Sequence, residues 1–182
     1  EKVRWQGIQP EFDPYKFNSF PVNASRQVNR AVRELQARLS AAAADGRLAR
    51  LAPVMAWQSA VDATVGSSGT VDLLYPQLAG GQHRLVLFDV NRFRGFSAVQ
   101  RPEARLVIER AIANHPGYIL EVVSNASRDS QDVVLERYPP GSASGVTEPL
   151  GLRWPDDVIS LGHVALPFPP DDPVYGFMPG SG

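Results

Sequence analysis

The sequence predicts an α/β fold, in which helices cover a largely parallel β-sheet. Residues 51–57 (LAPVMAW) and 83–90 (HRLVLFDV) are short, continuous apolar runs, typical of strands buried on both faces of a parallel sheet. Segments of helical periodicity precede, separate and follow these runs, which is the order of right-handed crossover units. We therefore expect a three-layer α/β/α arrangement, with helices on both faces of the sheet.

The first expected helix runs from about residue 24 to 44. Asn23 is a suitable N-cap, and Gly46 is a natural stop after the last turn. Apolar residues recur through the segment at helical spacing: Val28, Val32, Leu35 and Leu39. Residues 1–22 precede this helix as an aromatic arm, an extended segment whose rings need another surface. These rings are Phe12, Tyr15, Phe17 and Phe20.

The remaining elements follow in order along the chain. A Gly/Ser turn at 66–69 opens a second helix that ends near Gly80–Gly81, and Pro102 opens a third that closes by Gly117. The runs YILEVVSN and DVVLERYP flank a polar segment and predict a hairpin with a long turn. Residues 139–157 are rich in turn formers, and 158–182 form a proline-punctuated tail.

Composition excludes several classes of function. The 182 residues suffice for one domain. The 18 basic and 19 acidic residues are spread along the chain without blocks, and this distribution argues against a nucleic-acid surface or a polybasic membrane anchor. The chain has no cysteine and three separated histidines, so we expect neither a disulfide framework nor a metal site. No stretch approaches the roughly 20 apolar residues that span a bilayer. We expect a soluble protein, cytoplasmic or periplasmic.

Two residues are candidates for chemistry. Asp62 follows the first expected strand, and functional residues of open α/β sheets collect beyond the carboxyl ends of strands. The alternative for Asp62 is an aspartate that forms a turn or caps a helix. His163 lies in SLGHVALPF, before a proline-rich loop, which is a common place both for catalytic groups and for ordinary surface histidines. Asp89, at the end of the second strand, is a second candidate acid. His83 and His115 are expected to be structural or solvated, and the three tryptophans are expected to be core or interface rings.

Three segments resemble a known family. PVMAWQSAVDATV (53–65) resembles the acid-bearing strand and loop of α/β-hydrolases, in which the triad aspartate follows a proline-initiated strand, here as Pro53 and Asp62. ISLGHVALPFPPDDPVYG (159–176) resembles the histidine loop of a bacterial branch related to serine aminopeptidases and monoacylglycerol lipase-like esterases. FDPYKFNSFPVNASRQV (12–28) resembles the segment that follows the lid in that branch.

The resemblance implies the C-terminal half of an α/β-hydrolase fold over residues 23–182, with 1–22 as an arm that follows a lid. A helix and β-hairpin would then be inserted before the histidine loop, because His163 follows Asp62 by 101 positions. The implied activity is hydrolysis of carboxylic, possibly lipid, esters through an acyl-enzyme, without a cofactor. Asp62 would orient His163, in the family's chain order of serine, acid and histidine.

The nucleophile of such a triad is not in this sequence. The elbow requires G-x-S-x-G, whereas GFSAV (95–99), GSASG (141–145) and VGSSGT (65–70) depart from it and are typical of turns. We therefore expect the serine in an N-terminal half that acts as a partner, an inactive chain in isolation, and an apolar sheet edge open to that partner. Two alternatives are peptide hydrolysis in the same fold and a non-catalytic α/β interaction module.

Overall fold

The computed structural model describes residues 5–7, 20–62, 65–78, 80, 82–98, 100, 102–156 and 159, with side chains from residue 21 onward. The chain divides into two compact units, 1–50 and 51–182. No helix among these residues could span a bilayer; the longest of them, α1, is interrupted by charged side chains along its length.

The first unit is built around one long helix. α1 spans Val22–Ala44, as the sequence predicts, and Gly46 follows it with a positive φ of 73°. The predicted N-cap is wrong: Pro21 caps the helix, and Asn23 lies inside its first turn. Two short strands, β1 (Trp5–Gly7) and β2 (Phe20–Pro21), pair antiparallel before it, and a 3-10 turn, η1 (Arg47–Arg50), follows it. No residue of α1 is buried.

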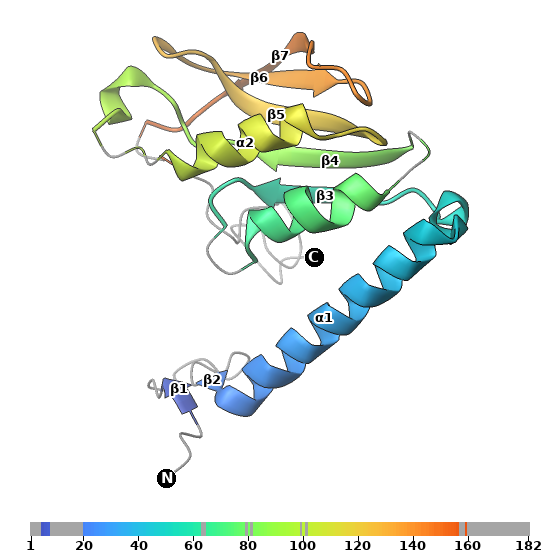
Figure 1. The fold of residues 1–182 in the computed structure, drawn as a ribbon. Helices are drawn as coiled ribbons and strands as arrows, with labels where there is room; N and C mark the ends of the chain where they lie inside the picture. Colours follow the sequence, from blue (N-terminus) through green and yellow to red (C-terminus); the bar gives the residue numbers. More distant parts are fainter. Residues whose placement is uncertain are drawn as a thin grey trace, which may run out of the picture. The chain divides into compact units, whose positions relative to one another are not determined.

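The second unit is a mixed five-stranded sheet in the order β3-β4-β5-β6-β7 (Figure 1). β3 (Met55–Ser59), β4 (His83–Phe88) and β5 (Tyr118–Ser127) are parallel to one another. β6 (Ser130–Tyr138) and β7 (Val146–Arg153) continue the sheet antiparallel. The α/β class is thus confirmed.

Two expectations about these strands are wrong. β7 occupies much of the segment 139–157 that we expected to consist of turns, because an edge strand tolerates the proline and glycine that hid it. β3 is not buried on both faces: it is an edge strand, with Met55 45% and Trp57 50% exposed. The predicted hairpin is present as β5–β6, but its turn is tight because the strands extend through the polar segment.

The helical segments of this unit lie on one face of the sheet (Figure 1). Gly69–Leu74 (η2) winds as a π-helix and Tyr75–Gln77 (η3) as a 3-10 turn where we expected one regular helix, and α2 spans Glu103–Ala113 as predicted. They enclose the core with alternate residues of β4 and β5, and its fully buried side chains include Tyr75, Tyr118, Leu85, Leu87 and Leu120. A second helical layer remains a prediction.

Candidate functional site

The carboxyl ends of β3, β4 and β5 meet at one edge of the sheet, because these strands are parallel and in register. The turn after β3 carries Asp62, the turn after β4 carries Asp89, and the last part of β5 carries Ser124 and Asn125. This carboxyl edge is where open α/β sheets place their functional groups. It is therefore the candidate site.

Asp62 is partly buried in a turn that its own side chain helps to form. Its Oδ1 accepts a hydrogen bond from the backbone N–H of Val65 at 2.9 Å, and its N–H donates to the carbonyl of Ser59 at 3.3 Å. This is the turn-forming role that the sequence left open. The residue borders a hollow of about 450 Å³ between this turn and the start of α2.

Asp89 is buried, 5% exposed, and its acceptor positions are filled. Arg92 binds both of its oxygens, with Nη2 at 2.8 Å from Oδ1 and Nε against Oδ2. The backbone N–H of Val90 donates to Oδ1 at 2.8 Å, and the hydroxyl of Ser124 donates to Oδ2 at 3.2 Å. Four donors therefore satisfy this carboxylate.

The loop after β4 is fixed to β5 by paired asparagines. Asn125 donates from Nδ2 to Oδ1 of the fully buried Asn91 at 2.8 Å, and accepts from the N–H of Arg92 at 2.6 Å. The N–H of Asn91 donates to the carbonyl of Ile159 at 2.6 Å, which holds the chain after β7 against the end of β4. We did not anticipate this network, although the run FDVNR at the end of a strand was a visible signal.

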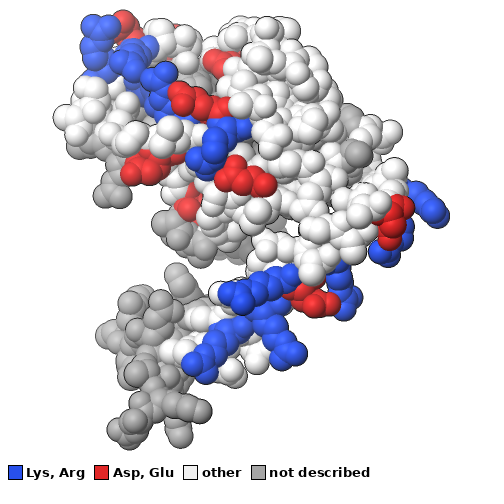
Figure 2. Space-filling view, in the orientation of Figure 1, with Lys and Arg blue, Asp and Glu red and all other residues white. Residues whose placement is uncertain are grey.

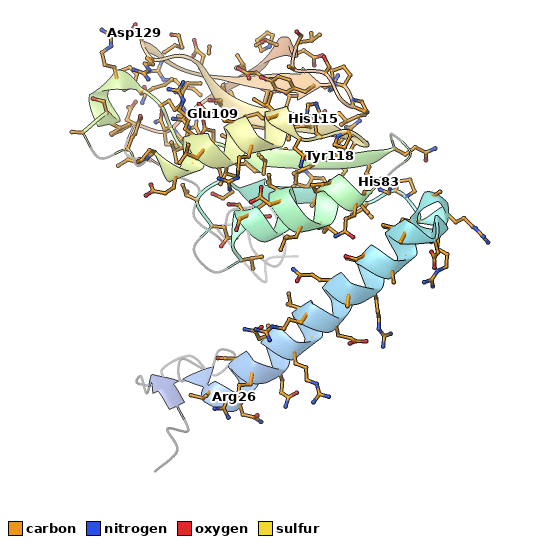
Figure 3. All side chains as sticks on the ribbon, viewed as in Figure 1. Arg26, His83, Glu109, His115, Tyr118 and Asp129 are labelled. Atoms are coloured by element: carbon orange, nitrogen blue, oxygen red, sulfur yellow. The ribbon has the colours of Figure 1, made fainter. Side chains whose placement is uncertain are left out.

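The predicted base, His163, lies outside the described residues. The two other histidines lie at the opposite, amino edge (Figure 3). The Nδ1 of His83 accepts from the N–H of Val54 at 3.0 Å, and the Nε2 of His115 lies 3.0 Å from the carbonyl oxygen of Pro139. Both are 2% exposed, which agrees with the structural role expected for them.

The serines of the three weak motifs occupy ordinary turns. Ser97 follows the short 3-10 turn η4 (Arg94–Phe96), and Ser144 lies in the exposed connection between β6 and β7. Ser67 is buried and donates its hydroxyl to the carbonyl of Ala60 at 3.2 Å. None of them lies on a tight turn that leads directly from a strand into a regular helix. The described residues hold no cluster of three or more acidic or histidine side chains that could bind a metal.

Of the tryptophans, expected as core or interface rings, one lies in the core and one on an edge strand. Trp154 is buried, and its Nε1 finds no partner among the described residues. Trp57 is half exposed on β3, so it is an edge residue and not a core residue of this unit. The side chain of Trp5 lies outside the described part.

Comparisons of this chain with protein-family models, with curated proteins and with solved structures found no match. The resemblance to α/β-hydrolases therefore remains a prediction from the quoted residues.

Proposed function

We propose that this chain is the acid- and base-contributing part of a serine hydrolase that cleaves carboxylic esters. Asp62 orients His163, and the nucleophilic serine comes from another polypeptide segment. The observation that carries the proposal is the carboxyl edge: Asp62 follows β3, and Ile159, four positions before His163, is held at the end of the neighbouring strand β4.

Chain length makes the pairing feasible. Four residues reach at most about 14 Å when extended, and neighbouring strands lie about 4.8 Å apart. The anchor at Ile159 therefore leaves the imidazole of His163 within reach of the turn after β3. This reach supports Asp62 as the acid because Asp62 is only partly buried, whereas Asp89 is buried and already accepts hydrogen bonds from four donors.

Asp89 is the weaker candidate acid. To donate its Nδ1–H to Asp89, an imidazole would have to displace one of the four donors that Asp89 already has. Two of these donors belong to Arg92. Displacing Arg92 would leave a largely desolvated guanidinium without its counter-charge, which costs several kcal/mol. Asp89 is better suited to hold the loop after β4.

The reaction follows from these roles. The serine Oγ attacks the ester carbonyl carbon while His163 accepts the hydroxyl proton, and Asp62 stabilises the imidazolium through Nδ1–H. The imidazolium then returns the proton to the leaving alcohol oxygen as its bond to carbon breaks. Water repeats the sequence on the acyl-enzyme and releases the acid.

The β3 edge supports a partner that supplies the serine. The N–H of Ala60 donates to the carbonyl of Phe88, and the carbonyl of Val54 accepts from Arg84, so positions 54 and 60 face β4. Because backbone groups alternate along a strand, the N–H and C=O groups of Met55 and Trp57 face outward. A parallel strand that ends in a nucleophile elbow would pair with these outward groups of β3.

The experiment is fluorophosphonate labelling and p-nitrophenyl ester hydrolysis, with the chain alone and with the polypeptide encoded upstream of it. We expect no labelling alone, and labelling of a G-x-S-x-G serine in the combination. In the active combination, Asp62→Asn should lower kcat about 10⁴-fold and His163→Ala at least as much. Asp132→Asn, an exposed carboxylate on β6, is the matched control and should leave kcat unchanged.

Three results would contradict the proposal. Labelling of Ser97 or Ser144 in the chain alone would identify a different nucleophile. Full activity of Asp62→Asn would remove the acid assignment. An upstream polypeptide that pairs with this chain but has no labelled serine would favour the non-catalytic interaction module.

A further inference from the structure

A second feature of the carboxyl edge concerns charge and not the triad. A hollow of about 290 Å³ lies between the loop after β4, the start of α2 and the β5–β6 turn, and we call it the arginine hollow. Its lining includes four guanidinium groups and two neutral polar side chains: Arg92, Arg94, Arg105, Arg128, Ser97 and Gln100. Figure 2 shows the blue side chains gathered over this end of the sheet, with red ones beside them.

Carboxylates hold three of these arginines in place without exhausting their donors. Arg94 Nη2 lies 3.0 Å from Asp129, and Arg105 Nε lies 2.7 Å from Glu109; Figure 3 shows both acids, on the β5–β6 turn and on α2. Arg92 is held by Asp89. Each guanidinium has five N–H donors, and these bonds use one or two of them. The pairs therefore orient the arginines and leave further donors.

Arg128 has no such counter-charge. Among the described residues, no acidic side chain forms an ion pair with it, and its backbone carbonyl accepts from the N–H of Arg94 at 2.7 Å. The described lining of the arginine hollow contains no carboxylate. Asp89, Glu109 and Glu136 line an adjoining hollow, which they share with Arg92, Arg105 and Arg128. Within the arginine hollow itself, four guanidinium groups face one space with no carboxylate among its described lining residues, and an anion bound there would relieve their mutual repulsion.

Hydrogen bonds connect the loop that carries Arg92 and Arg94 to its neighbours. Gln100 donates from Nε2 to the carbonyl of Asn91 at 2.8 Å, and Asn91 is itself bound to Asn125. These bonds fix the backbone from which Arg92 and Arg94 extend, so less backbone has to be ordered when a ligand binds.

We propose that the arginine hollow binds the phosphate group of a small phosphorylated ligand. Several guanidinium forks suit the oxygens of a dianionic phosphate better than the two oxygens of a carboxylate. The volume lies at the lower limit of ligand sites, so it fits a single phosphate-sized group. This inference does not depend on the proposed hydrolase activity.

The test is equilibrium dialysis of radiolabelled inorganic phosphate against the 182-residue chain at constant ionic strength. We expect saturable binding that Arg128→Gln weakens about tenfold, which is the loss expected for a charge-assisted hydrogen bond. Arg128→Gln breaks no ion pair with a described residue, so a folding defect is not expected. Arg105→Gln should also weaken binding, whereas its matched control Arg38→Gln, an exposed i,i+4 pair on α1, should not.

Competition identifies the ligand class. If glycerol phosphate and inorganic phosphate displace the label equally, the ligand is a phosphomonoester. If only inorganic phosphate displaces the label, the ligand is free phosphate. Equal displacement by acetate would overturn the phosphate assignment. Binding that is absent, or that is the same in Arg128→Gln as in the parent chain, would overturn the site.

Discussion

The two outer strands of the five-stranded sheet, β3 and β7, are built differently. β7 carries the charged residues Glu148 and Arg153, a proline at 149, a glycine of positive φ at 151, and a register irregularity against β6. Native proteins use such features to keep other strands from pairing. β3 is short, but it has no charge, no proline and a regular register with β4. The sequence of β7 therefore disfavours pairing with a further strand, whereas β3 lacks these protective features.

The network at the carboxyl ends of β4 and β5 should contribute strongly to the stability of the chain. Asp89→Ala tests this, and it should have the largest effect on the unfolding free energy. Removing Asp89 leaves Arg92, whose side chain is 22% exposed, without its counter-charge, so we expect a loss of about 3–5 kcal/mol of unfolding free energy. Urea denaturation measures it. Asp129→Ala, which removes an exposed partner of Arg94, is the control and should cost less than about 1 kcal/mol. Equal costs would contradict this role of the network.

Met55→Pro tests the open edge directly. The variant removes an outward N–H of β3 and keeps the β3–β4 hydrogen bonds, so the chain should fold but bind the elbow-carrying polypeptide about 100-fold more weakly. Titration of fluorophosphonate labelling measures the affinity. Met55→Ala retains the N–H and serves as the control. If proline and alanine weaken binding equally, the partner does not pair with this edge.

High pH should destabilise the folded chain through two tyrosines buried in the core. Burial raises the pKa of Tyr75 to about 12 and also raises the pKa of Tyr118, whose ring lies 4.8 Å from it. The unfolded chain ionises its tyrosines near pH 10. Stability should therefore be complete below pH 10 and fall between 10 and 12, by about 1.4 kcal/mol per pH unit for each such tyrosine.

Urea denaturation across this pH range measures the fall. Tyr75→Phe should reduce the slope, at the cost of its hydrogen bond to the carbonyl of Arg84. A stability that stays constant from pH 10 to 12 would show that these tyrosines are not buried as described.

A lysine on each edge gives the smallest expected effect on the chain itself. Leu152→Lys and Trp57→Lys both replace exposed apolar side chains, so each should change the unfolding free energy by less than about 0.5 kcal/mol. Their effects on the partner should differ: Leu152→Lys leaves the affinity unchanged, whereas Trp57→Lys reduces it. A loss of affinity in both variants would erase the distinction between the edges.

Local patterns predicted most elements of the fold. α1, β4, α2 and the β5–β6 hairpin appear where periodicity and end signals placed them. The errors arose where tertiary position overrides composition. β7 contains Pro149 and Gly151, which only an edge strand accommodates, and the apolar run around β3 suggests burial that this unit does not provide.

By itself, the sequence determined the α/β class, the position of Asp62 after a strand, and the lack of a nucleophile elbow, because each depends on residues close together in the chain. The tertiary structure decided which strands are the outer ones and which side chains form hydrogen bonds at the carboxyl ends of β4 and β5. Ser124 reaches Asp89 across 35 positions, Asn125 reaches Asn91 across 34, and Arg94 reaches Asp129 across 35. Such contacts exist only after β4 and β5 have paired, and no local pattern specifies them.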